Sequence, residues 1–189
     1  MSPAVVLVGV PGSGKTTVGQ ALAEQLDLAF DDTDQMIERR AGRSVSDIFV
    51  QSGEEAFRDL EHDVVAEALA SHSGVLALGG GAVMDANSRA LLIEVPTVWL
   101  KVDTDTAVRR VGLNAPRPVL LGNVRGQLKA LTAQREPLYT EVATIDVDTT
   151  DREPAQIAAE IIESLSLKDQ PGSTTCRTRR FRCVSEALP

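Results

Sequence analysis

Residues 5–17 constrain this chain more than any other stretch. They begin with the apolar run Val5-Val6-Leu7-Val8 and continue into residues 9–16, which fit the pattern G-x-x-x-x-G-K-S/T. The apolar spacing of a helix follows directly, at Val18, Leu22, Ala23 and Leu26. A plain glycine-rich turn is the alternative. The strand pattern before the loop and the helix pattern after it favour a phosphate-binding loop.

The residue types of this loop suit phosphate. Its glycines let backbone N–H groups turn inward, and the helix that begins there adds the positive end of its dipole. Lys15 is predicted to be catalytic because its ammonium would reach the terminal phosphates, and the Thr16 hydroxyl would ligate Mg²⁺. The predicted ATP-binding residues of this stretch are Gly12, Ser13, Gly14, Lys15, Thr16 and Thr17.

Composition places limits on the compartment and the partners. The 189 residues suffice for one α/β domain with a full core. No apolar run approaches the roughly 18 residues that span a bilayer, and no basic region precedes the first apolar run, so we expect a cytoplasmic protein without a membrane partner. A net charge of −8 disfavours bulk nucleic-acid binding. We also expect a monomer.

The end of the chain differs from the rest. Residues 169–189 carry four arginines against Asp169 and Glu186, and they hold both cysteines, Cys176 and Cys183. A disulfide framework or a cysteine metal site is therefore excluded for the rest of the chain. From Pro171 the composition is typical of disorder, so we predict one domain over residues 1–168 and a disordered tail over 169–189.

Five apolar segments alternate with helical patterns. The expected strands lie near residues 5–8, 28–31, 75–78, 97–102 and 143–147, and the expected helices include residues 85–93, 105–111 and 127–135, the last followed by Pro137. This alternation predicts a three-layer α/β/α fold with a five-stranded parallel sheet. In such a sheet, ligands bind beyond the carboxyl ends of the strands.

Carboxylates follow the second expected strand at Asp32 and Asp34. In an extended tail they would share one side and face the same crevice as the phosphate loop. The alternative is a helix N-cap at Asp34, which precedes a short helical pattern. Capping would occupy only one of the two, so the pair favours a functional role.

The third expected strand ends in Gly79, Gly80 and Gly81 where many P-loop proteins have an aspartate for Mg²⁺. The metal-supporting carboxylate must then come from elsewhere, and Asp32 is best placed. Three glycines would let a substrate lie against the backbone.

Arg58 and Glu61 lie three residues apart on the preceding amphipathic helix, where an ordinary surface ion pair is the plainest interpretation. His62 and His72 are interpreted as solvated.

Residues 112–123 fit no regular element. Pro116 and Pro118 surround Arg117, and Gly122 closes the segment, which indicates a mobile lid that brings positive charge to a transferring phosphoryl group.

Taken together, these motifs resemble the shikimate kinases, a family of the nucleoside-monophosphate-kinase-like P-loop fold. The resemblance covers about residues 4–166. The matching segments, in order, are residues 9–16, Asp32-Thr33-Asp34, Phe57-Arg58 with Glu61, residues 79–81, Arg117-Pro118 with Leu120-Leu121, and Arg135 with Pro137-Leu138-Tyr139.

The resemblance implies transfer of the γ-phosphoryl group of ATP to the 3-hydroxyl of shikimate in aromatic amino-acid biosynthesis. On the nucleotide side it implies Thr16 on Mg²⁺, with Asp32 supporting the metal through water. Lys15 and Arg117 would neutralise the phosphoryl oxygens, which makes Arg117 a predicted catalytic residue. The predicted adenine-side residues are Arg110, Pro118 and Arg152.

On the acceptor side the resemblance implies that Asp34 binds the substrate hydroxyls and orients or deprotonates the nucleophile, so Asp34 is also predicted to be catalytic. Arg58, Arg135 and the backbone of Gly79, Gly80 and Gly81 would hold the substrate, with the arginines on its carboxylate.

Three alternatives stay open on the sequence alone. A gluconate or nucleoside monophosphate kinase would share the phosphate loop and the lid without needing both aspartates. A regulatory nucleotide switch would carry an Asn-Lys-x-Asp motif, which this sequence lacks. A nucleic-acid-binding role would act through the tail, and a chain ending at Lys168 would test it.

Overall fold

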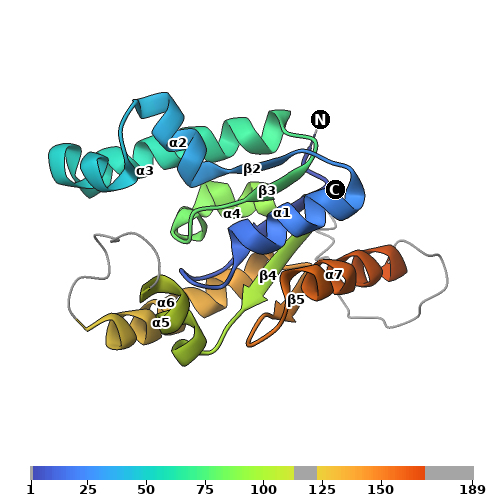
Figure 1. Cartoon of the computed structure of the whole chain (residues 1–189). Coiled ribbons are helices and arrows are strands. Elements are labelled where there is room, and N and C mark those ends of the chain that lie inside the picture. The colour runs from blue at the N-terminus through green and yellow to red at the C-terminus, as the bar shows by residue number, and fades with distance from the viewer. Residues whose placement is uncertain (1, 113–122, 169–189) are drawn as a thin grey trace, which may run out of the picture.

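A single parallel sheet organises the protein (Figure 1). The computed structural model describes residues 2–112 and 123–168. Within them, five strands pair in the order β2-β3-β1-β4-β5. They are β1 (Val5–Val8), β2 (Phe30–Asp32), β3 (Val75–Ala77), β4 (Thr97–Lys101) and β5 (Ile145–Asp148). This arrangement confirms the predicted five-stranded parallel α/β fold.

Helices cover both faces of the sheet (Figure 1). One face carries α1 (Lys15–Leu26) and α7 (Pro154–Lys168), and the other carries α3 (Val45–Ser71), α4 (Ala86–Leu92) and α6 (Val124–Val142). Three further elements are α2 (Thr33–Ala41), which packs on α3, α5 (Thr104–Gly112), which packs on α6, and a short 3₁₀ helix, η1 (Ala82–Met84).

Strand β1 explains why the core has two halves. Val5 and Leu7 pack with α1 and α7, whereas Val6 and Val8 pack with α3, α4 and α6. Successive side chains of a strand point to opposite faces, so a central strand between two helical layers must be apolar at every position. The unbroken run at residues 5–8 therefore identifies the middle of the sheet.

Helix α6 differs from the sequence-based expectation, and helix α3 is interrupted. Helix α6 continues through Pro137 to Val142, because Tyr139 and Val142 are buried in the core beyond the proline and packing outweighs one lost backbone hydrogen bond. Helix α3 contains a kink at Gly53, where φ is 83° and ψ is 173°. Gly53 therefore separates two helical pieces of α3.

The described part of the chain has no helix that is both long and apolar enough to cross a lipid bilayer. Most of the predicted lid, including Arg117 and Pro118, and the tail over 169–189 lie outside the described residues.

Candidate active site

The carboxyl ends of the strands meet at one edge of the sheet, and the phosphate loop lies there between β1 and α1. Gly12 in this loop has a φ of 82°, and a Cβ atom there would come within 2.7 Å of the carbonyl oxygen of Ala107. Only glycine fits that position. Lys15 Nζ donates to the carbonyl oxygens of Gly9 at 2.9 Å and Val10 at 3.2 Å. These bonds hold the ammonium group over the loop.

Asp32 links the loop to the next strand. Thr16 Oγ1 donates to Asp32 Oδ2 at 2.9 Å, and Asp32 Oδ1 accepts the backbone N–H of Asp34 at 3.0 Å. The N-cap of α2 is therefore Asp32, and the expectations of a cap at Asp34 and of an extended tail through both aspartates are wrong. The helix begins two residues earlier than expected, at Thr33, because the Asp32 side chain supplies an oxygen for its first turn.

The Thr16 hydroxyl and the Asp32 carboxylate form a donor set that suits Mg²⁺. Both are hard oxygen ligands, which Mg²⁺ prefers, and they lie beside the lysine of the phosphate loop. Among the described residues, no group of three or more histidine, cysteine, aspartate or glutamate side chains could hold a metal by itself. These two oxygens fit an ion that completes its coordination with nucleotide phosphates and water.

Asp34 lies against the glycine loop over residues 79–81. A Cβ atom on Gly79 would come within 2.5 Å of Asp34 Oδ1 and 2.9 Å of Glu61 Oε1, so two carboxylates approach the backbone there. The Gly79 N–H donates to the buried Thr33 hydroxyl at 2.9 Å. Thr33 thus fixes the start of the loop, a role that its place between two aspartates did not reveal.

Gly80 is the part of this loop that α6 holds. Its carbonyl oxygen accepts Arg135 Nη1 at 2.8 Å and Tyr139 Oη at 2.9 Å. Burial raises the pKa of Tyr139 to about 12, so its hydroxyl remains a neutral donor. Arg135 is only 7% exposed, and its Nε atom is buried with no hydrogen-bond partner in the described structure. A buried, unpartnered donor on a cation suits an anionic ligand.

Arg58 approaches the other end of the same loop from α3. Its Nη1 pairs with Glu61 Oε2 at 2.5 Å and its Nη2 with Glu54 Oε1 at 3.3 Å, while a Cβ atom on Gly81 would collide with its guanidinium. The interpretation of an ordinary surface pair is wrong, because Glu61 is only 4% exposed. Burial raises the pKa of Glu61, with the cation of Arg58 acting against that shift.

A cavity of about 260 Å³ borders Arg58, Glu61, His62, Gly81 and Asp85. His62 Nδ1 lies 3.0 Å from Asp85 Oδ2, and His72 Nε2 lies 3.2 Å from the carbonyl oxygen of Val75. The interpretation as solvated is wrong for His72, whose side chain is only 12% exposed, whereas the side chain of His62 is 37% exposed. Both contacts reach elements that follow α3 in the chain, so the helical pattern of α3 alone did not reveal them.

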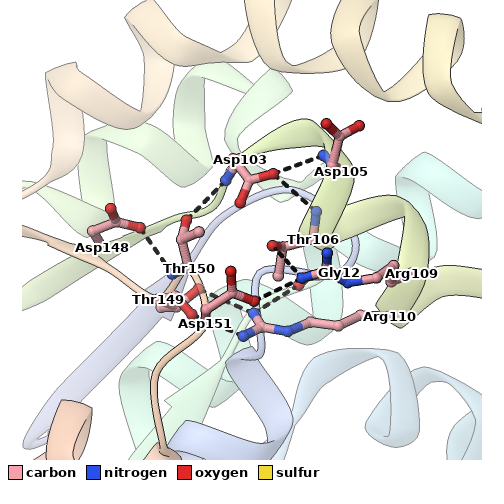
Figure 2. Close-up of polar contacts among 10 residues, drawn as sticks. All are labelled: Gly12, Asp103, Asp105, Thr106, Arg109, Arg110, Asp148, Thr149, Thr150 and Asp151. Carbon is pink, nitrogen blue, oxygen red and sulfur yellow. Dashed lines mark hydrogen bonds and ion pairs between the residues drawn. The ribbon is translucent and has the colours of Figure 1, made fainter.

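Arg110 lies on α5 beside the phosphate loop (Figure 2). Its Nη1 donates to the carbonyl oxygen of Gly12 at 3.3 Å, and its Nη2 donates to that of Thr149 at 2.8 Å. Arg152 donates to the carbonyl oxygen of Asp148 at 2.8 Å and also pairs with Glu160 on α7. The structure thus brings Arg110 to the loop and places Arg152 with β5 and α7.

This fold and this edge of the sheet define an ATP-dependent kinase of the P-loop class. The model of the shikimate kinase family matches residues 11–166. The chain belongs to the shikimate kinase family.

Similar proteins support this assignment. The chain is 57% identical to the shikimate kinase of Thermobifida fusca over 85% of its own length and 92% of that protein. It is 54% identical to the shikimate kinase of Salinispora arenicola, over 88% of this chain and 99% of that protein. A solved structure of the shikimate kinase from Acinetobacter baumannii in complex with shikimate is 34% identical, with a TM-score of 0.86 and coverage of 90% of this chain and 96% of that one.

Proposed function

We propose that this protein transfers the γ-phosphoryl group of ATP to the 3-hydroxyl of shikimate, giving shikimate 3-phosphate and ADP in chorismate and aromatic amino-acid biosynthesis. The observation that carries the acceptor assignment is Arg135, a buried guanidinium beside the glycine loop with an unpartnered Nε. Family membership and a relative whose structure contains shikimate support the same acceptor.

The acceptor side needs one clamp for a carboxylate and one acceptor for hydroxyls. Arg135 and Arg58 flank the loop over residues 79–81 and would bind the carboxylate through guanidinium N–H groups. The backbone of Gly79, Gly80 and Gly81 would border the ring. Asp34, whose Oδ1 lies beside Gly79, would accept the substrate hydroxyls and orient the attacking oxygen or take its proton.

The nucleotide side needs neutralisation of charge more than covalent chemistry. Lys15 would leave the carbonyl oxygens of Gly9 and Val10 and pair with the β- and γ-phosphates. Bound at Thr16 and, through water, at Asp32, Mg²⁺ would supply further charge neutralisation on the phosphate oxygens. Gly12, Ser13, Gly14 and Thr17 would complete the phosphate site.

The transfer is an in-line displacement. The acceptor oxygen forms a bond to the γ-phosphorus, the bond from that phosphorus to the β–γ bridging oxygen breaks, and ADP leaves with the bridging electrons. The hydroxyl proton leaves by way of Asp34 or directly to water. Arg110, Arg152 and Pro118 would hold the adenine side, and Arg117 on the lid would neutralise the transferring group.

We also propose that the protein acts as a monomer in the cytoplasm without nucleic-acid or membrane partners. Its acidic composition and its small-molecule acceptor support this. Light scattering on the purified protein would give the mass of one chain; the mass of a dimer would contradict the proposal.

The test of the proposed function is a coupled ADP-release assay with ATP and Mg²⁺ in which shikimate, quinate, gluconate and AMP are offered in turn. Turnover far above background with shikimate supports the proposal. Turnover with gluconate or AMP alone would keep the kinase class and overturn every acceptor-side role. ADP release at one rate whatever the acceptor would instead indicate a nucleotide switch.

A further inference from the structure

Beyond the residues proposed to touch ATP, and resting on ATP as the phosphoryl donor, we propose that Thr149 is a positioning residue for the nucleotide. Its buried hydroxyl holds the outer edge of the phosphate loop and the guanidinium of Arg110 in one arrangement. The phosphate end and the adenine end of the nucleotide site are thereby set by the same side chain.

Thr149 follows β5 and has no exposed surface. Its Oγ1 lies 3.0 Å from the carbonyl oxygen of Ser13 and 2.9 Å from that of Lys101. The same oxygen accepts Arg110 Nη1 at 3.2 Å, a contact drawn in Figure 2. A hydroxyl has one proton and two lone pairs, so it donates to one carbonyl at a time while it accepts from the arginine. Three segments of the chain therefore meet at one buried oxygen.

The contact with Ser13 orients the backbone N–H of Gly14, a group that would bind phosphate. The C=O and the N–H of one planar trans peptide point in opposite directions. When the Ser13 carbonyl turns outward to Thr149, the N–H of Gly14 turns to the inner side of the loop, where a phosphate would lie. The Thr149 hydroxyl thus favours the orientation of the loop that binds an anion.

The contacts with Arg110 act on the other end of the site. Nη1 bonds Thr149 Oγ1 and Nη2 bonds Thr149 O, so both terminal nitrogens of the guanidinium rest on one residue. Nη1 also reaches the carbonyl oxygen of Gly12 at 3.3 Å. A guanidinium held by its terminal nitrogens has its plane fixed, which suits a group that packs beside an adenine ring.

Removing the hydroxyl alone tests this role. Thr149→Val keeps the shape and leaves the Ser13 carbonyl without its Thr149 partner, whereas Thr149→Ser keeps the hydroxyl. The matched control is Thr97→Val. Thr97 is equally buried, and its Oγ1 lies 3.1 Å from the carbonyl oxygen of Leu92 and 3.2 Å from that of Val95, but it lies at the opposite, amino-terminal edge of the sheet.

The readout is the dissociation constant of ADP by calorimetry, with the KM values for ATP and shikimate beside it. For Thr149→Val we expect ADP to bind about tenfold more weakly, because the free loop is no longer held in its anion-binding orientation by a hydrogen bond worth about 1 kcal/mol. The KM for ATP should rise in parallel and that for shikimate should stay close to the wild-type value. Thr149→Ser should restore ADP binding, and Thr97→Val should bind ADP like the wild type.

Unchanged ADP affinity in Thr149→Val, or an equal loss in Thr97→Val, would overturn the proposal. If the valine variant does not fold, Thr149→Ala removes the same hydroxyl with a smaller side chain, and the same outcomes apply to it. ADP binding needs no acceptor. A wild-type protein that binds ADP but leaves shikimate unphosphorylated would therefore refute the proposed function. The ADP affinities of the variants would still test the role of Thr149 in that case.

Discussion

A guanidinium removed from water costs a folded protein free energy unless negative groups accompany it. Arg135 meets this cost with the carbonyl oxygen of Gly80 on Nη1 and with the nearby carboxyl group of Glu61, and its Nε stays unpartnered. A bound carboxylate would complete its hydrogen bonds. At the scale of single residues, the acceptor site depends most on this side chain.

Arg135→Ala should therefore raise the KM for shikimate by about a hundredfold, within the range for truncating one partner of a buried charge pair, and leave the KM for ATP near its wild-type value. Steady-state kinetics with each substrate varied would measure this. Arg125→Ala is the control, because Arg125 lies on the same helix and pairs with Asp105 at the surface. Equal weakening of both substrates would assign Arg135 to the nucleotide.

Lys15→Ala should lower kcat/KM for ATP by about a thousandfold, because the ammonium stabilises charge that develops on the phosphoryl group. The far-ultraviolet circular dichroism should match the wild type, since the lysine donates to loop carbonyls and is not part of the hydrophobic core. Lys129→Ala, an exposed position on α6, serves as the control. Near-normal turnover in Lys15→Ala would refute the phosphate-loop assignment.

Glu61 marks the limit of sequence reasoning at this scale. The spacing of Arg58 and Glu61 on one helix predicts their contact, and the structure has it at 2.5 Å. Spacing contains no information on what packs against the helix, however, so the burial of Glu61 against the glycine loop could not be predicted. Thr33, Tyr139 and Thr149 were missed as functional positions for the same reason, because their partners are distant in sequence.

At the scale of elements, helix caps hold the binding residues in place. Asp103 precedes α5, the helix that carries Arg110, and its Oδ1 accepts the backbone N–H groups of Asp105 at 2.8 Å and Thr106 at 2.9 Å. These bonds hold the pKa of Asp103 at about 2, below its ordinary value of 3.8, and the bond from Thr106 has the largest effect.

A carboxyl group whose pKa is lowered by folding stabilises the folded state above its ordinary pKa, and that contribution is lost as the pH falls toward the lowered value. Asp103→Asn keeps an acceptor but loses the charge. It should be less stable than the wild type at about pH 7, and the difference should shrink between about pH 4 and pH 2. Urea unfolding at both ends of this range measures it; a difference independent of pH would contradict the account.

The kink in α3 gives a second prediction at this scale. Gly53 adopts φ 83° and ψ 173°, a region that only glycine occupies without strain, although a Cβ atom there would meet no other atom within 4 Å. Gly53→Ala should lower the free energy of unfolding by about 2 kcal/mol.

Gly112 on α5 is the matched control for Gly53. Its added Cβ would also meet open space, but its φ is not positive. Gly112→Ala should leave stability unchanged or raise it by up to about 1 kcal/mol, because alanine favours the helix. Thermal and urea unfolding of both variants would compare them. A Gly53→Ala variant as stable as the wild type would show that the kink is not required.

For the whole molecule, the sequence predicts the sheet because a parallel strand buried on both faces must be apolar throughout. The continuation of α6 through Pro137 could not be predicted, because the packing of Tyr139 in the core outweighs the tendency of a proline to end a helix. The topology then brings the ends of five strands to one edge, so motifs far apart in the chain form one site. The predicted lid and tail stay predictions, because they lie outside the described residues.

The most direct measurement is nuclear magnetic resonance of the product formed from ATP, Mg²⁺ and shikimate by the wild-type protein. Transfer of the γ-phosphoryl group to the 3-hydroxyl predicts a new phosphate-monoester signal whose phosphorus couples to the proton on carbon 3 of the ring, with one ADP formed for each ester. Inorganic phosphate in place of an ester, or an ester at another ring position, would contradict the proposed reaction.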